Sequence, residues 1–418
     1  MIWQRLLQRY RTQSLFFLLS WVLALVFSME FVLSVSMIAL IVLSVFQWQS
    51  PQQGFPIQLR SGLGDRLRAF IRRPDFVAVT IPFFLVLLTL PYSSDWGYGL
   101  ERLRIKLPFL LLPFAFFSLP PLSRRQANGL LYAFVGLASL AALITGIRYG
   151  LNFEYITEQM KKGQHIPTPG NHIRFSLMLA FAVLTGAILW ARRYTWRYAW
   201  ERHLIGLMTV FLFLFIHVLS VRSGLLVLYL SIAFMALRYI WVKRRWGPGL
   251  AALALLVLLP VLAYQFIPSF YSKVNYARYD LEMYFKGEGA TYSDSERLVS
   301  LGVGWQVVKE QPWLGVGAGD LRAEVYRRFE EQHPEIEHPK MPHNQLLTIW
   351  AGCGLWGLVV FLGAFVVPLW YRRRYGSALF ASLHLIVFIS YMMENTIENA
   401  VGVAFYLLFL LLGMVVLE

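Results

Sequence analysis

Long apolar runs, separated by short clusters of charged residues, prolines and glycines, make up most of this 418-residue chain. A helix needs about 20 predominantly apolar residues to cross a hydrocarbon core of about 30 Å, and many of the runs approach that length. The pattern predicts an all-α, polytopic membrane protein with about 12 transmembrane helices. The predicted spans are 14–27, 31–46, 76–90, 107–119, 128–147, 173–190, 203–219, 225–240, 250–267, 344–370, 378–393 and 397–417.

The run from 205 to 240 is almost uninterrupted, but it is too long for one span. As a single helix it would measure about 54 Å, well beyond the hydrocarbon core. Its polar residues cluster at Ser220, Arg222, Ser223 and Gly224. The chain is therefore predicted to turn there, with one span on each side.

The composition argues against other classes of protein. With 57% hydrophobic and 15% charged residues and a mean hydropathy of +0.54, the chain has too little polar surface for a soluble domain or for a soluble enzyme on one membrane anchor. Its one cysteine, Cys353, leaves no intrachain disulfide, cysteine-rich zinc site or CxxC redox pair. The first apolar run is followed at once by another and lacks a small-residue cleavage site, so we interpret it as a span and not as a removed signal peptide.

The charged residues divide unevenly between the two sides of the predicted bundle. With the N-terminus in the cytoplasm, the inner side carries 21 Lys and Arg with 4 Asp and Glu, and the outer side carries 17 and 19 respectively. This positive-inside pattern predicts that both termini are cytoplasmic. The net charge of +15 then reflects orientation and contacts with membrane lipids, and no nucleic-acid partner is expected.

Two outer loops are long enough to carry function. The larger, 268–342, is rich in charges of both signs, and a smaller one covers 148–172. We therefore predict three parts: spans one to nine in 1–267, a loop subdomain with short helices in 268–342, and spans ten to twelve in 343–418. The chain shows no internal repeat, which weakens an inverted-repeat transporter interpretation.

Two arginines on the predicted outer side are candidates for binding an anion. Arg222 lies at the tip of the predicted turn, where it could bind phosphate through its planar fork or simply extend to the membrane interface. Arg297 follows Ser293–Glu296, whose S-x-x-E form predicts the start of a loop helix. An ordinary ion pair with Asp294 or Glu296 is the alternative for Arg297.

His343 is the candidate base. Together with Asn344 it follows Pro339 and Pro342 and directly precedes an apolar run, so it should stand at the N-terminus of a span. Free N–H groups at a helix N-terminus disfavour a protonated imidazole, and a neutral imidazole can accept a proton. A simple cap or interface residue is the alternative.

A metal site is not expected. His333, His338 and His343 recur every five residues among several glutamates, but this spacing fits no common zinc pattern. We interpret the segment as a solvated acidic loop, and we expect neither a metal nor another cofactor.

Two groups of glycines predict close contacts of the backbone. The first, at 315–319, lacks the Lys-Ser/Thr of a phosphate-binding loop, so a tight turn is expected. The second, at 352–357 within the tenth span, predicts close helix approach. Glu394 and Glu398, in the short turn before the last span, are candidate partners for an outer arginine.

Three stretches resemble one protein family in their content, order and spacing. They are LSVRSGLLVL around Arg222, SERLVSLGVGWQVVKEQPWLGVGAGDL from Ser295, and HNQLLTIWAGCGLWGL from His343. Over roughly 218–358 the chain is similar to the O-antigen ligase and polymerase superfamily.

The resemblance implies a metal-independent glycosyltransferase in the bacterial inner membrane, with its active site on the periplasmic side. Such enzymes take a glycan from undecaprenyl diphosphate, and in the ligases the acceptor is lipid A-core. By this resemblance Arg222 and Arg297 hold the donor diphosphate, and His343 is the base for the acceptor hydroxyl. Charge stabilisation of the leaving diphosphate and removal of a proton are the roles that the chemistry requires.

The resemblance adds three binding residues and leaves one point open. His172 and Arg174, in PGNHIRFSL, are expected on the donor side, and Asn344 is expected to bind substrate beside His343. Many relatives have an acidic residue where this chain has Gly352, so the role of that carboxylate is absent or moved.

Three alternatives remain at the level of sequence. An O-antigen polymerase or a protein O-oligosaccharyltransferase of the same superfamily would use the same residues. A polytopic transporter or flippase belongs to a different class, but it would favour ionisable groups near the middle of the membrane, whereas the charges here lie mainly at span ends.

Overall fold

The computed structural model of the protein describes residues 2–48, 57–286, 293–334, 336 and 338–416. The first half contains α1 (Ile2–Val26), α2 (Glu30–Val45), β1 (Phe46–Trp48), β2 (Ile57–Leu59), α3 (Leu63–Ile71), α4 (Pro74–Thr89), η2 (Leu90–Tyr92), α5 (Trp96–Ser118), α6 (Arg124–Leu151), α7 (Phe153–Lys161), α8 (His172–Ala191) and α9 (Glu201–Leu219). The second half contains α10 (Arg222–Lys243), α11 (Trp246–Phe266), α12 (Pro268–Phe285), α13 (Ser293–Glu310), α14 (Leu321–Gln332), α15 (Gln345–Trp370), η3 (Tyr371–Gly376), α16 (Ala378–Met393) and α17 (Ala400–Val416).

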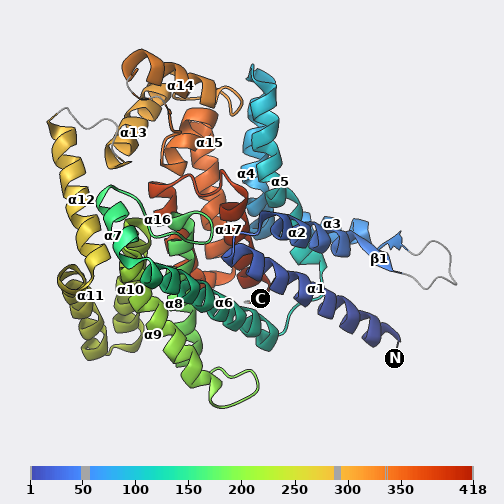
Figure 1. The fold of residues 1–418 in the computed structure, drawn as a ribbon. Helices are drawn as coiled ribbons and strands as arrows, with labels where there is room; N and C mark the ends of the chain where they lie inside the picture. Colours follow the sequence, from blue (N-terminus) through green and yellow to red (C-terminus); the bar gives the residue numbers. More distant parts are fainter. Residues whose placement is uncertain (1, 49–56, 287–292, 335, 337, 417–418) are drawn as a thin grey trace.

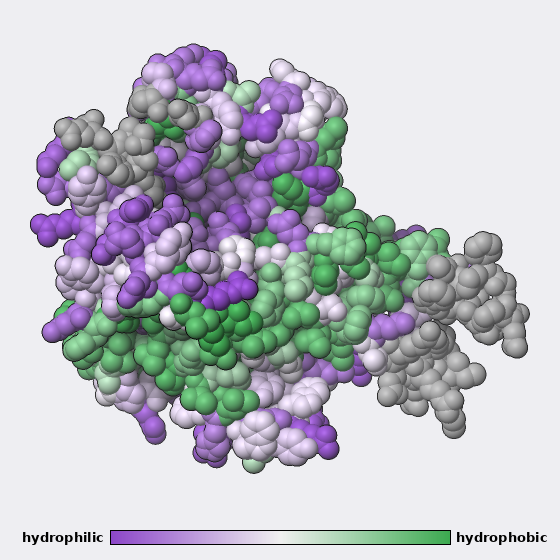
Figure 2. Space-filling view, in the orientation of Figure 1, coloured by the Kyte–Doolittle hydropathy of each residue, from purple (hydrophilic) through white to green (hydrophobic). Residues whose placement is uncertain are grey.

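Every predicted span coincides with a helix of this structure. Within the described residues, 7 helices are long and apolar enough to cross a membrane, and shorter apolar helices include α2, α16 and α17. Figure 2 shows a hydrophobic band across the molecule with hydrophilic residues on both sides of it. The prediction of a helical, multi-pass membrane protein is confirmed, while the number of twelve spans stays a prediction.

One short hairpin accompanies the helices. β1 and β2 form a two-stranded antiparallel hairpin in which Phe46 pairs with Leu59 and Gln47 with Gln58. Strands of three residues are too short to show the alternating pattern that identifies a strand in a sequence. The hairpin follows α2 directly and lies at the edge of the bundle (Figure 1).

The predicted turn between the seventh and eighth spans is confirmed. α9 ends at Leu219, its C-cap residue Ser220 has the left-handed backbone conformation (φ 54°), and α10 begins at Arg222. Gly224 then packs against α8, because a Cβ at Gly224 would lie only 2.4 Å from the Cβ of Ser176. This close contact holds the start of α10 beside the first turns of α8.

The predicted outer loops contain helices. α7 lies within 148–172, and α12, α13 and α14 lie together at one end of the bundle (Figure 1). α13 begins at Ser293, where the S-x-x-E pattern predicts a helix start, although the Ser293 side chain falls outside the described residues. α13, α14 and α15 share a separate apolar core that includes Val303, Val325 and Phe329.

The two groups of glycines turn out to form one contact. α15 is broken at Gly354 (φ 72°, ψ −179°), and a Cβ there would lie 2.0 Å from the carbonyl oxygen of Trp313. The loop between α13 and α14 fills the break: the backbone N–H of Gly317 donates to the carbonyl of Gly352 (3.0 Å), and that of Leu355 donates to the carbonyl of Pro312 (2.9 Å). The loop is therefore bonded directly to the backbone of α15.

Candidate active site

One carboxylate joins the candidate base to a candidate anion-binding arginine. The Nδ1 atom of His343 lies 3.3 Å from Oε1 of Glu394, and Nη2 of Arg297 donates to the same oxygen at 3.1 Å. The side chain of His343 is 24% exposed, that of Glu394 15% and that of Arg297 30%, so a ligand can reach the group. Glu394 is thus the partner of an outer arginine that the sequence suggested. The carboxylate beside His343 comes from the loop before the last helix and not from the position of Gly352.

Asn344 fixes the backbone next to His343. Its Oδ1 accepts from the backbone N–H of Leu347 (3.0 Å), which caps α15, and its Nδ2 donates to the carbonyl of Met392 at the end of α16 (3.3 Å). Asn395 adds a second tie, because its Nδ2 donates to the carbonyl of Pro342 at 2.6 Å. Asn344 is therefore engaged with the protein, and its predicted contact with substrate stays untested.

Two imidazoles lie together at the start of α8. Asn171 caps α8 by accepting from the backbone N–H of Ile173 (3.0 Å), and His172 is the first residue of the helix. The ring of His172 stacks on that of His165, with centroids 3.7 Å apart and planes inclined by 21°. The second His thus comes from the loop that joins α7 to α8.

The charges around His165 show which groups lie near it. Burial, followed by the charges of Lys273, His172, Arg222 and Arg297, lowers the pKa of His165 to about 3. The imidazole is therefore neutral at physiological pH, surrounded by cations from α10, α12 and α13. Among these cations is Lys273 of α12, which is buried (4% exposed) and donates from Nζ to the carbonyl of Gly163 (2.9 Å).

Glu394 remains ionised in this setting. Burial raises its pKa, but the hydrogen bond with His343 and the charges of Arg297 and Arg174 outweigh burial and hold the pKa below its usual value. Arg174 lies two residues after His172 in the first turn of α8. The negative charge of Glu394 therefore lies among basic groups from α8, α13 and the loop before α15.

The sequence-predicted residues thus come together, although they are far apart in the chain. His343 and Arg297 share Glu394, Arg174 interacts electrostatically with that carboxylate, and Arg222 and Arg297 both act on His165. This group, which we call the cationic cluster, consists of His165, His172, Arg174, Arg222, Lys273, Arg297, His343 and Glu394. Such a set can hold a multiply charged anion and remove a proton beside it.

Sequence reasoning did not identify His165 and Lys273 as members. His165 lies in the smaller outer loop and Lys273 in the larger one, and both loops stood out by length. Neither residue belongs to a recognisable pattern, and only the fold brings them to the cluster.

The candidate metal ligands do not assemble. Among the described residues, no group of three or more His, Cys, Asp or Glu is placed to hold a metal ion. His333 ends α14, where its ring lies 6.3 Å from that of Phe329, while His343 contacts Glu394.

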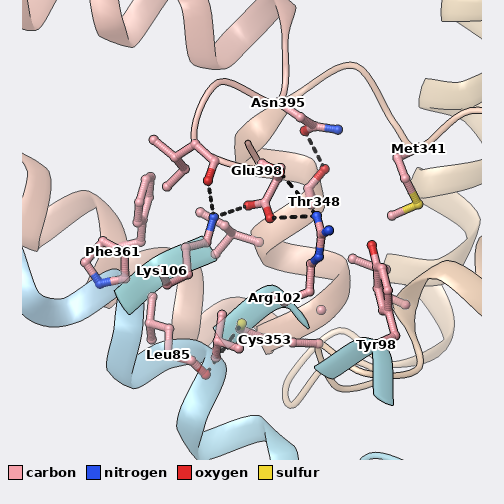
Figure 3. A pocket seen from close by; sticks show the side chains of 17 residues that line it. Leu85, Tyr98, Arg102, Lys106, Met341, Thr348, Cys353, Phe361, Asn395 and Glu398 are labelled. Carbon is pink, nitrogen blue, oxygen red and sulfur yellow. Dashed lines mark hydrogen bonds and ion pairs between the residues drawn. The ribbon is translucent and has the colours of Figure 1, made fainter. Parts of the chain in front are cut away.

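A small cavity is lined in part by the loop that carries Glu394, through Asn395, Ile397 and Glu398. Its volume is about 120 Å³, and α4, α5 and α15 contribute to its walls. Figure 3 shows Lys106 and Arg102 of α5 directed at Glu398. Lys106 is 3% exposed and donates from Nζ to Oε1 of Glu398 (2.7 Å), and Gln345 donates to the same oxygen (2.7 Å). Through Glu398, the loop between α16 and α17 is tied to the start of α15 as well as to α5.

Comparison with known proteins identifies a segment that carries half of the cationic cluster. A search of curated proteins gave no match. Residues 207–362 match the family model described as O-antigen ligase. The matched segment includes Arg222, Lys273, Arg297 and His343, whereas α8 and Glu394 lie outside it. The family match indicates a glycosyltransferase-like enzyme that acts on lipid-linked sugars, and it confirms that this chain resembles the O-antigen ligase and polymerase superfamily.

Proposed function

We propose that this protein is an O-antigen ligase that transfers a glycan from undecaprenyl diphosphate to lipid A-core, without a metal, on the periplasmic side of the bacterial inner membrane. The observation that supports the proposal best is the shared carboxylate of His343 and Arg297, next to the cations around His165. The family match over residues 207–362 supports the class of reaction.

The donor diphosphate would bind to the cationic cluster. Arg222, Arg297 and Lys273 bring three positive charges from three helices to one region. When the bond between the sugar and the diphosphate breaks, its electron pair passes to the diphosphate oxygen. Fixed guanidinium groups stabilise that developing charge more in the transition state than in the bound donor, which accelerates the reaction.

The acceptor hydroxyl would be activated by His343. With Nδ1 directed at the carboxylate of Glu394, the imidazole presents Nε2 to the acceptor. Nε2 takes the hydroxyl proton while the oxygen forms a bond to the anomeric carbon of the donor sugar. The positive charge that develops on His343 is stabilised by Glu394, and the undecaprenyl diphosphate leaves.

Reconstitution tests the reaction directly. Purified protein, undecaprenyl-diphosphate-linked glycan and lipid A-core should yield glycan-bearing lipid A-core, both with and without EDTA. A reaction abolished by EDTA and restored by a divalent metal would disprove the metal-independent mechanism. Movement of the lipid-linked glycan across a vesicle membrane without any transfer would favour a flippase.

The choice of acceptor separates the ligase from its relatives. A polymerase would lengthen the glycan on the carrier, and a protein O-oligosaccharyltransferase would modify a Ser or Thr peptide. Deletion of the gene gives an independent readout, because loss of a ligase leaves long carrier-linked glycans, whereas loss of a polymerase leaves single repeat units.

A further inference from the structure

A second and larger cavity lies at the elbow between α11 and α12. Its volume is about 660 Å³, which falls within the range of roughly 300 to 1,000 Å³ that is usual for small-molecule sites. We call it the tyrosine pocket after its aromatic lining, which consists of Tyr264, Phe266, Tyr271, Tyr276 and Tyr279. α7 closes one side with Thr157 and Lys161.

One face of α12 forms much of this pocket. Tyr271, Asn275 and Tyr279 are spaced by four residues, so they lie along one stripe of the helix. Lys273 and Asp280 lie on the opposite side of the helix from this stripe and are buried, with 4% and 0% exposure. α12 therefore presents one side to the pocket and the other side, with Lys273, to the cationic cluster.

The pocket and the cationic cluster share a wall. Tyr276 lines the pocket, and a Cβ at Gly163 would lie 2.7 Å from its hydroxyl oxygen. The carbonyl of the same Gly163 accepts from Lys273 (2.9 Å), and His165 follows two residues later. A ligand whose diphosphate is bound by the cluster can thus place its neighbouring groups beside α12.

The arrangement of the aromatic side chains favours a sugar over a lipid chain. Tyrosines are also enriched at membrane interfaces, where their rings lie at the level of the lipid headgroups. Here the rings of Tyr264 and Tyr271 lie 5.0 Å apart at 43°, and the hydroxyl of Tyr264 donates to Oδ1 of Asn275 (3.3 Å). Gln265 and Ser272 add further polar groups. Rigid rings beside hydroxyls and amides match the apolar C–H faces and the hydroxyls of a saccharide, whereas a hydrocarbon chain would leave the polar groups without a ligand partner.

We propose that the tyrosine pocket binds a sugar unit of the donor glycan beyond the sugar that is attached to the diphosphate. The proposal rests on the proposed function, because that function supplies the lipid-linked glycan. It adds a substrate-recognition surface made by residues of α7, α11 and α12.

Donors of different length test the proposal. With a donor that carries several repeat units, Tyr271→Ala and Tyr279→Ala should each raise KM about 2- to 10-fold, the range expected for loss of one aromatic contact, with little change in kcat. A donor with a single sugar should be affected less, and Tyr271→Phe should retain the wild-type KM. Tyr155→Ala is the matched control, because Tyr155 is 69% exposed on α7 and lies outside the pocket.

Binding of the free oligosaccharide provides a readout that does not depend on transfer. In saturation-transfer NMR, wild-type protein should transfer saturation to the free oligosaccharide that has been released from the donor. Tyr271→Ala should weaken this signal. The variant should still elute as a single folded species in size-exclusion chromatography. An unchanged signal and an unchanged KM in both alanine variants would overturn the proposal, as would an equal effect of Tyr155→Ala. Failure of the wild-type protein to transfer any glycan, with oligosaccharide binding intact, would instead reject the proposed function.

Discussion

His343 and Arg297 contact the same oxygen atom, Oε1 of Glu394, at 3.3 and 3.1 Å. The carboxylate therefore orients the imidazole and at the same time positions a guanidinium group. We expect Glu394→Gln to lower kcat about 10- to 100-fold, because a neutral amide loses a charge-assisted contact worth about 1.5 to 3 kcal/mol. Steady-state kinetics with purified protein measure this. A variant with wild-type kcat would show that the carboxylate does not support His343.

Arg222 and Arg297 are predicted to act on the leaving diphosphate. Arg222→Ala and Arg297→Ala should each lower kcat/KM about 10- to 100-fold, because each removes a charge-assisted hydrogen bond. Arg278→Ala is the matched control, since Arg278 is exposed on α12 and belongs to the same highly charged segment. If Arg222→Ala and Arg297→Ala had the same kcat/KM as Arg278→Ala, a phosphate-binding role for the two arginines would be excluded.

The low pKa of His165 predicts a loss of stability in acid. Its pKa is about 3 in the folded protein and about 6.5 in an unfolded chain, so the unfolded chain binds more protons between these values. The stabilising contribution is complete above about pH 6.5 and declines as the pH falls toward 3. Thermal unfolding in detergent at about pH 7.5 and 5 should show a smaller drop in Tm for His165→Asn than for wild type. Between pH 7.5 and 5, Glu394 stays ionised in the folded protein, because its pKa is held below its usual value. An equal drop in Tm for His165→Asn and for wild type would mean that His165 lies in a more solvated environment.

Gly354 is predicted to tolerate no side chain. Its φ of 72° and the 2.0 Å between a built Cβ and the carbonyl oxygen of Trp313 mean that Gly354→Ala must move the backbone. We expect a large fall in Tm or loss of folded protein. Gly136→Ala in α6 is the control, because a Cβ there meets nothing within 4 Å and alanine favours a helix by up to about 1 kcal/mol. A Tm for Gly354→Ala equal to that of the control would mean that α15 is not broken at this residue.

The buried pair of Lys106 and Glu398 is predicted to behave as a unit. Lys106→Met leaves the carboxylate without its nearest cation, which typically destabilises a protein by about 3 to 5 kcal/mol. Adding Glu398→Gln removes the uncompensated charge and should restore part of the loss. A double-mutant cycle on thermal stability measures the coupling, and purely additive effects would contradict a direct interaction.

The sequence was informative where the physical cause is local. Apolar runs predict each spanning helix because the membrane imposes their length, and the polar group from Ser220 to Gly224 predicts the turn because one helix could not remain in the membrane. The order of three motifs predicted Arg222, Arg297 and His343 as one site. In the structure His343 and Arg297 contact Glu394, and the charges of Arg222 and Arg297 both act on His165.

The remaining features depend on contacts between distant segments. Lys273 is one of many charges in its loop, and it enters the cationic cluster only because α12 packs beside the loop after α7. The glycines around Gly317 and Gly354 are each recognisable as places of close approach, but a single sequence does not reveal that they approach one another. The short hairpin of β1 and β2 escaped prediction because three residues carry no periodicity.

The bonding of the 312–317 loop to the broken backbone of α15 limits how this protein can be rearranged. Gly317 and Leu355 donate hydrogen bonds across the junction, so the loop and α15 form one unit. A chimera that receives residues 268–342 from a similar protein should therefore need the first half of α15 from that same protein. Replacing the loop alone would leave backbone N–H and C=O groups of Gly317, Gly352, Pro312 and Leu355 without matched partners.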